Sequence, residues 1–212
     1  MGMEMVIFIP VLFFSIILHE FAHGFVAYRL GDDTAYHAGR LTLNPLKHID
    51  PLGTIIVPLL CYFTGMPLFG WAKPVPINPL RMSSPQRDMG KVAIAGPAVN
   101  LGLAVCFVLI LKGTLLLQGS LSIQAVQSLL ALTKYGILIN VMLAVFNLMP
   151  IPPLDGGRIV TALLPVRPAL VYDRFFGRWG MWIVFGLIAT GLMRYLLLPP
   201  AQWVLGLLGK IL

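Results

Sequence analysis

The chain has 212 residues, of which 58% are hydrophobic and only 11% are charged, and its formal net charge is +7. Ordinary soluble domains carry roughly 25% charged residues. A mean hydropathy of +0.88 is also more than a soluble core requires. The composition therefore excludes an ordinary soluble domain. It predicts one membrane domain of about four to six spans, at roughly 20 residues each.

The first half of the chain predicts one long helix and a hairpin. Hydropathy places the helix at about Met5 to Tyr28, followed by a polar stretch from Arg29 to Asp50. The next apolar segment, Leu52 to Phe69, contains prolines and a glycine, so it is a poor candidate for a complete crossing. We expect it to join the proline-rich stretch Lys73 to Pro79 in a re-entrant hairpin over about 52–80, which could be β-like.

The second half of the chain predicts three further helices, at about Met89 to Leu117, Ala125 to Met149 and Trp179 to Leu198. Between the last two, the chain breaks at three prolines, presents Asp155-Gly156-Gly157 and continues as a basic loop. The predicted fold is an all-α polytopic membrane protein with about four full transmembrane helices plus the hairpin. It forms a single membrane-embedded domain over residues 1–212.

Basic residues suggest how this domain is oriented. All but four of the 15 Lys and Arg residues lie on one side of the membrane if the hairpin returns, the four being Lys112, Lys134, Arg194 and Lys210. Loops rich in these residues stay in the cytoplasm. We expect a multi-pass protein of a prokaryotic cell membrane, with its active site towards the cytoplasmic side. Contact with lipid explains the basic residues after Asp155 better than nucleic-acid binding does.

The pentapeptide His19-Glu20-Phe21-Ala22-His23 lies at the end of the uncharged apolar run Met5 to Leu18. Residues four apart share one face of a helix, so His19 and His23 can hold one zinc ion while Glu20 faces a water molecule. The alternative is a set of polar residues that pack helices together. The spacing and the distant Asp-Gly-Gly favour the metal site.

A zinc hydrolase commonly uses three protein ligands, and Asp155 is the best candidate for the third. It is one of two acids at apolar segments, the other being Glu20, and such a group is costly unless it is paired or bound to metal. With a returning hairpin, the first helix and Asp155 approach the same face of the membrane. The alternative role of Asp155 is a turn or a helix cap.

Four motifs together resemble the site-2 proteases, zinc enzymes that cut membrane-spanning helices. Besides the pentapeptide, the resemblance rests on three stretches: Gly39-Arg40-Leu41-Thr42-Leu43-Asn44-Pro45 with His48-Ile49-Asp50-Pro51, Gly96-Pro97-Ala98-Val99-Asn100, and Asn147-Leu148-Met149-Pro150-Ile151-Pro152-Pro153-Leu154-Asp155-Gly156-Gly157. The resemblance is to the compact form of the family, without a PDZ or CBS domain.

The resemblance implies that His19, His23 and Asp155 bind one Zn²⁺, that Glu20 is the general base, and that Asn147 positions the scissile carbonyl or its oxyanion. The implied substrates are transmembrane helices of other proteins in the lipid bilayer. Specificity would come from the membrane part or from a regulatory partner, and a homo-oligomer is an open alternative. An unwound substrate could pair with the stretch Val75 to Pro79 by strand addition.

Other polar residues have simpler interpretations. Hydrogen bonding between helices would explain Asn140 and is the alternative for Asn147, while Gly96, Ala98 and Asn100 suit close helix approach. His37 and His48 are expected to be solvated loop residues. Two other classes of function remain: a catalytically silent scaffold that binds membrane helices, and a small metal transporter with a transient site.

Overall fold

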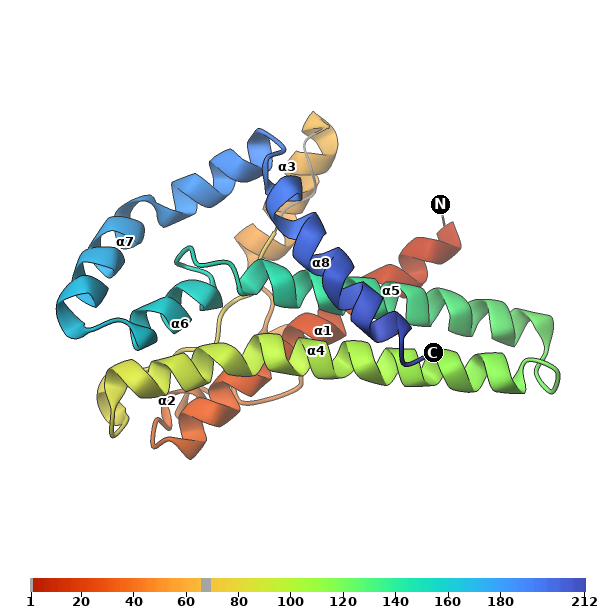
Figure 1. The fold of residues 1–212 in the computed structure, drawn as a ribbon, viewed down its shortest axis with the longest axis horizontal. Coiled ribbons are helices and arrows are strands. Elements are labelled where there is room, and N and C mark those ends of the chain that lie inside the picture. The colour runs from red at the N-terminus through yellow and green to blue at the C-terminus, as the bar shows by residue number, and fades with distance from the viewer. Residues whose placement is uncertain (1, 66–69) are drawn as a thin grey trace.

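The computed structural model describes residues 2–65 and 70–212, which are mostly helical (Figure 1). No strand occurs in these two ranges. The elements follow in the order α1 (Gly2–Arg29), α2 (Thr34–His37), the 3₁₀ turn η1 (Pro45–Lys47), the π-helical turn η2 (Pro51–Ile56), α3 (Val57–Thr64), the 3₁₀ turn η3 (Pro79–Arg81), α4 (Pro85–Leu117), α5 (Ile123–Asn147), α6 (Asp155–Leu163), α7 (Val166–Ala189) and α8 (Met193–Gly209).

Three helices in the described ranges are long and apolar enough to cross a bilayer, namely Val6–Arg29 within α1, α4 and α5. The consecutive helices α7 and α8 pass the same test only as a pair, and they are bent by 84°. Large apolar side chains such as Leu116 and Trp182 are exposed on these helices, as expected where lipid replaces water. The prediction of an all-α polytopic membrane protein is confirmed.

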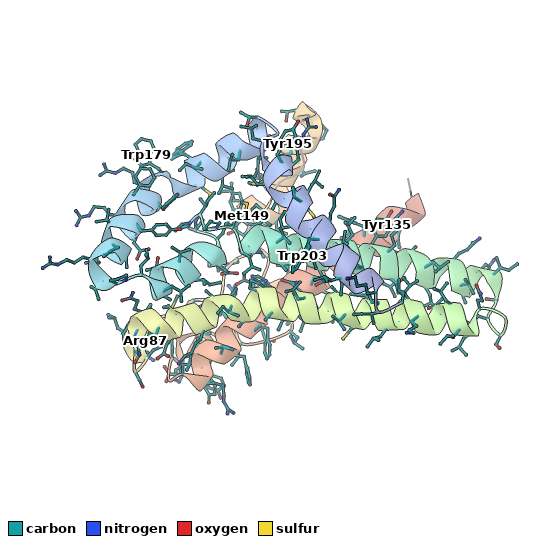
Figure 2. All side chains as sticks on the ribbon, viewed as in Figure 1. Arg87, Tyr135, Met149, Trp179, Tyr195 and Trp203 are labelled. Carbon is teal, nitrogen blue, oxygen red and sulfur yellow. The ribbon has the colours of Figure 1, made fainter. Side chains whose placement is uncertain are left out.

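Helices α4 and α5 lie side by side and antiparallel, α1 packs against both, and α8 crosses α5 (Figure 1). Small residues allow these close approaches. A Cβ atom on Gly136 of α5 would lie 2.5 Å from the Phe107 ring of α4. A buried cluster that includes Val141, Met149 and Leu197 joins α5 to α8, and Figure 2 shows Met149 in the middle of the molecule. The core therefore forms between the long helices.

The prediction for the last span is wrong in its bounds. The chain turns between α7 and α8, inside the expected helix Trp179 to Leu198. Gly191, which follows the C-cap Thr190, has a φ of +72°, a left-handed conformation that commonly ends helices. The prediction of a basic loop after Asp155 is also wrong, because the basic residues in this stretch belong to helices α6 and α7. The Thr190-Gly191 pair marks the end of α7 in the sequence, but hydropathy averaged over a whole span does not show it.

The segment expected to form the hairpin begins as helix rather than as β-structure. After Asp50 the chain forms η2 and α3, and residues 66–69 lie outside the described part. The two arms then meet: the Trp71 N–H donates to the Gly53 carbonyl at 3.1 Å, and the Lys73 N–H to the His48 carbonyl at 2.9 Å. The chain thus comes back beside its starting point. A re-entrant path through a membrane remains a prediction.

Candidate metal centre

The three predicted ligands converge. His19 and His23 lie on one face of α1 and are 6% and 7% exposed, and their Nε2 atoms are 3.0 Å apart. Asp155, the first residue of α6, places Oδ2 3.2 Å from each Nε2 atom. This trio is the only group of three or more His, Cys, Asp or Glu side chains with metal-binding geometry in the described ranges. Residues from opposite halves of the sequence therefore form one buried cluster.

Asp155 is placed by a tight turn between α5 and α6. The Leu154 N–H donates to the Ile151 carbonyl, and the Gly157 N–H to the Leu154 carbonyl, both at 3.0 Å. A Cβ atom on Gly156 would lie only 2.2 Å from the Leu148 carbonyl oxygen, so the first turn of α6 rests directly on the chain leaving α5. The break expected at the three prolines separates α5 from α6, and α6 begins at Asp155 itself.

Both histidines present Nε2 to the cluster because Nδ1 is used elsewhere. The Nδ1 atom of His23 lies 2.7 Å from the Val92 carbonyl oxygen, and that of His19 lies 2.6 Å from Asn100 Oδ1. Both partners are acceptors, so each Nδ1 carries the proton. A neutral imidazole then has a bare lone pair on Nε2. Such contacts fix the ring orientation and the tautomer of metal-binding histidines.

A buried network determines which way the Asn100 amide points. Asn140 Nδ2 donates to the Gly136 carbonyl and to Ser15 Oγ, at 2.8 and 2.9 Å. Its Oδ1 then accepts from Asn100 Nδ2 at 2.9 Å, which leaves Asn100 Oδ1 for His19. The predicted packing role of Asn140 is confirmed. Asn100 does more than permit close helix approach, because it completes the link to a ligand.

The carboxylate of Asp155 is buried beside the imidazole rings of His19 and His23. Its Oδ2 atom is fully buried within 3.2 Å of both Nε2 atoms, yet it receives no hydrogen bond. Two bare nitrogen lone pairs and one carboxylate oxygen thus face a common centre. Such groups repel one another unless a cation lies between them.

The geometry of the cluster fits zinc. Ligand atoms on a tetrahedral zinc ion, with bonds of about 2.0–2.1 Å, lie roughly 3.3 Å apart, and the three pairs here are separated by 3.0 to 3.2 Å. Three protein ligands leave the fourth position to water or substrate, as in catalytic sites. Gly96 on α4 makes room, since its Cβ would lie 2.5 Å from both imidazole rings. His19, His23 and Asp155 can therefore hold the ion.

Glu20 lies beside the cluster without joining it. Its half-buried side chain follows His19 on α1, and Oε2 accepts the backbone N–H of Val75 at 2.8 Å. Val75 belongs to the extended chain after the hairpin, so two distant segments meet at this carboxylate. The position agrees with a role next to the metal, and the role as general base remains a prediction.

The position of Asn147 says less about its predicted role than the positions of the three ligands do. It is the last residue of α5, and its Nδ2 donates to the Leu143 carbonyl one turn earlier at 2.9 Å. The described structure gives it no hydrogen bond to the three ligands. One N–H and the amide oxygen are therefore left for another partner, and the predicted contact with a substrate carbonyl remains untested.

The two loop histidines differ. His37 is exposed and pairs with Asp33 at 3.1 Å, as expected of a solvated residue. The same expectation is wrong for His48, which is 2% exposed and whose Nε2 lies 2.9 Å from the Thr42 carbonyl oxygen. His48 caps the end of the η1 turn, where its N–H donates to the Pro45 carbonyl at 3.0 Å. A periodic pattern that would have indicated burial is absent from such irregular chain.

The comparisons with known proteins agree with this geometry. The model of peptidase family M50 matches residues 7–188. The Bacillus subtilis protein YwhC is 40% identical over 188 residues, which cover 87% of this chain and 81% of that protein. Rip2 of Mycolicibacterium smegmatis is 33% identical over 191 residues, covering 89% of this chain and 69% of Rip2. Both relatives are named as zinc metalloproteases, and no solved structure gives a significant match. The chain is therefore a zinc metalloprotease of peptidase family M50, the site-2 protease family.

Proposed function

We propose that this chain is an intramembrane endopeptidase that hydrolyses peptide bonds in or near the transmembrane segments of other membrane proteins, the reaction of regulated intramembrane proteolysis. One observation carries the proposal. His19 and His23 lie within the candidate span Val6–Arg29, so the metal centre is built on a helix suited to the bilayer. A peptide bond reaching these ligands would come from a segment that can itself enter the membrane.

The proposed chemistry divides between the metal and Glu20. When bound, zinc supplies Lewis acidity, which acidifies a water molecule and polarises a carbonyl oxygen. Glu20 would take the proton of the attacking water on its carboxylate, hold it, and deliver it to the nitrogen of the leaving amine. The hydrogen bond from the Val75 N–H to Oε2 supports this role, because it restrains one oxygen and leaves the other available.

Asn147 would assist at the substrate. Its amide keeps one N–H after donating to the Leu143 carbonyl, and that N–H can hydrogen-bond the carbonyl of the bond being cut. It stands at the end of α5, just before the turn that presents Asp155. This location supports a role near the reacting carbonyl.

A helical substrate must unwind before its backbone can reach the site. The chain over residues 70–78 has no regular secondary structure and belongs to no strand in the described ranges, so a substrate could pair with it by strand addition. Pro74 and Pro76 lack an N–H, so at these two positions the edge offers carbonyl acceptors only. We therefore expect a substrate to pair chiefly through its own N–H groups.

We also propose that the site opens towards the cytoplasmic side of a prokaryotic cell membrane. Arg81 pairs with Asp33, just after α1, and Arg87 and Lys91 line the same groove as the end of α6. At the opposite end of α4, Lys112 donates to the Ile211 carbonyl near the carboxyl terminus. This separation supports a basic face near the start of α4, as the positive-inside rule requires of a cytoplasmic face.

The proposal can be tested in proteoliposomes that contain the full chain and a doubly tagged single-span reporter. The reporter helix is built from Leu and Ala with a central Asn-Pro-Gly break, which favours unwinding. We expect cleavage within or beside the span, located by mass spectrometry of both fragments. Glu20→Gln should abolish cleavage while retaining about one zinc ion per chain.

The matched control is Asp33→Asn, which also converts one carboxylate to an amide but lies in an exposed ion pair with Arg81. It should cleave like the wild type. Cleavage by Glu20→Gln at the wild-type rate would refute the general base. Zinc transport without cleavage in the same vesicles would instead support a transporter.

A further inference from the structure

The extended segment over residues 73–78, called the strap below, rests on α1 beside the metal centre. Its sequence is Lys73-Pro74-Val75-Pro76-Ile77-Asn78. The Val75 side chain is 6% exposed, and a Cβ atom on Gly24 would lie 2.9 Å from Val75 Cγ1. The same residue donates its N–H to Glu20. The strap thus touches α1 at Glu20 and again one turn later.

An extended chain of this kind needs unusual support. Strands are normally held by a ladder of backbone hydrogen bonds, whereas the strap belongs to no strand in the described ranges and is joined to the preceding arm only at its first residue, where the Lys73 N–H donates to the His48 carbonyl. Two prolines also remove donors within it. Its position must therefore depend on other contacts, and the described hydrogen bonds place buried charged side chains at both ends.

Asp32 holds the carboxyl end of the strap. Its side chain is fully buried, and Oδ2 accepts the Asn78 N–H at 2.6 Å. The other oxygen, Oδ1, accepts both the N–H and the hydroxyl of Thr34. A carboxylate that accepts three hydrogen bonds is well compensated for its burial. This short contact ties the strap to the turn that follows α1.

Arg40 holds the amino end. It is 8% exposed, and Nη2 donates to the Lys73 carbonyl at 2.7 Å and, at 3.5 Å, to the Pro74 carbonyl. Among the described residues no carboxylate pairs with this guanidinium, and its Nε atom is buried without a partner. A buried cation without a counterion is costly. The backbone of the strap is its hydrogen-bonding partner.

We propose that Asp32 and Arg40 are positioning residues for the proteolytic reaction. They fasten the two ends of the strap, so that the Val75 N–H meets Glu20 and restrains one oxygen of its carboxylate. The inference rests on the proposed role of Glu20 as general base. A displacement of about 1 Å in a catalytic group can lower the rate by up to about 10²-fold. Loosening either anchor should therefore lower turnover, and it should also weaken substrate binding because the strap is part of the proposed pairing edge.

The test uses the full chain with the Leu/Ala reporter carrying the Asn-Pro-Gly break. Asp32→Asn and Arg40→Met should each lower kcat by about tenfold or more, and KM should rise as well because the strap is part of the proposed pairing edge. Zinc content should stay at about one per chain. Arg40→Lys, which can still donate to the Lys73 carbonyl, should recover part of the loss.

Two neighbouring residues provide matched controls. Asp33→Asn and Arg81→Met make the same chemical changes in an exposed ion pair, whose side chains are 42% and 50% exposed. Both control variants should keep the wild-type kcat. The comparison separates loss of a strap anchor from a general effect of removing charge near this loop.

Amide hydrogen exchange gives a readout that requires no substrate. Since residues 74, 76 and 79 are prolines, a peptide covering the strap reports only the N–H groups of Lys73, Val75, Ile77 and Asn78. Exchange should be slow in the wild type and in both controls, and faster in Asp32→Asn and Arg40→Met. The result does not depend on whether the reporter is cleaved.

The outcomes separate this inference from the proposed function. Faster exchange with an unchanged kcat would mean that the anchors only stabilise the loop, and unchanged exchange would mean that they do not hold the strap. Either result overturns the positioning role while Glu20→Gln remains inactive. If Glu20→Gln instead cleaves like the wild type, the proposed base itself is refuted.

Discussion

Asn100 Oδ1 lies 2.6 Å from Nδ1 of His19, and this contact connects the helix interface to the metal centre. The amide is oriented by Asn140, which uses its own Nδ2 for Gly136 and Ser15. As a result, His19 must donate from Nδ1 and present a bare Nε2. The polar network between α1, α4 and α5 therefore orients His19, a predicted zinc ligand, as well as joining three helices.

Asn100→Leu should weaken zinc binding by about 10–100-fold, the usual effect of removing a hydrogen-bond partner of a metal-binding histidine. Leu keeps a similar volume but offers no acceptor, so the His19 ring loses its fixed tautomer and orientation. The affinity can be measured by competition with a chromogenic chelator in detergent.

Asn100→Asp keeps the acceptor and should bind zinc more tightly than Asn100→Leu does. The control is Asn44→Ala, which removes an exposed amide that caps η1 far along the sequence from the ligands. Its affinity should equal that of the wild type. Equal affinities for Asn100→Leu and the wild type would show that the network serves helix packing alone.

The spacing of two predicted zinc ligands could be read from the sequence because helical periodicity places His19 and His23 together. Asp155 could also be identified, since an acid at an apolar segment demands a partner. The contacts from the Val92 carbonyl and the Val75 N–H could not, because every residue carries these backbone groups. Only the folded chain decides which of them meet a side chain.

The bend after α7 could not be predicted from the sequence for a different reason. Hydropathy averages over about 19 residues, and apolar side chains continue on both sides of Gly191, so the average shows one span where the chain turns by 84°. The positive φ of this glycine is a single-residue feature. The burial of irregular segments such as the one around His48 could not be predicted from the sequence either, because it follows from tertiary contacts.

Gly96→Ala should abolish zinc binding. A Cβ at this position would lie 2.5 Å from His19 Cε1 and His23 Nε2, and both rings are held by hydrogen bonds to α4 on their Nδ1 side. Relief of the clash therefore requires α1 and α4 to separate or the rings to leave the ligand geometry. Metal analysis of the purified variant should give much less than one zinc per chain.

Gly102→Ala is the matched control on the same helix, because a Cβ atom added there would meet nothing within 4 Å. It should retain zinc, and the better helix propensity of Ala predicts equal or slightly greater thermal stability. Full zinc content in Gly96→Ala would mean that the two helices adjust without cost.

Removal of the metal should destabilise the wild type specifically. A ligand that binds only the folded state contributes about 4 kcal/mol when its free concentration is 1,000 times Kd. A strong chelator should therefore lower the Tm in detergent, and added zinc should restore it. His23→Ala and Asp155→Ala should contain little zinc, and their Tm should not respond to the chelator. A chelator-sensitive Tm in both variants would place the bound metal elsewhere.

Gly156→Ala should disrupt the presentation of Asp155 more severely than its small size suggests. The added Cβ would lie 2.2 Å from the Leu148 carbonyl oxygen and 2.4 Å from that of Met149, both backbone atoms that cannot rotate away. The first turn of α6 must then move off the end of α5 and carry Asp155 with it, so zinc content and reporter cleavage should both fall. Gly177→Ala in α7, where nothing lies within 4 Å of the new Cβ, should leave both unchanged. Normal zinc content in Gly156→Ala would show that Asp155 still reaches the metal when its turn is displaced. The tight α5–α6 junction would then not be what positions the Asp155 carboxylate.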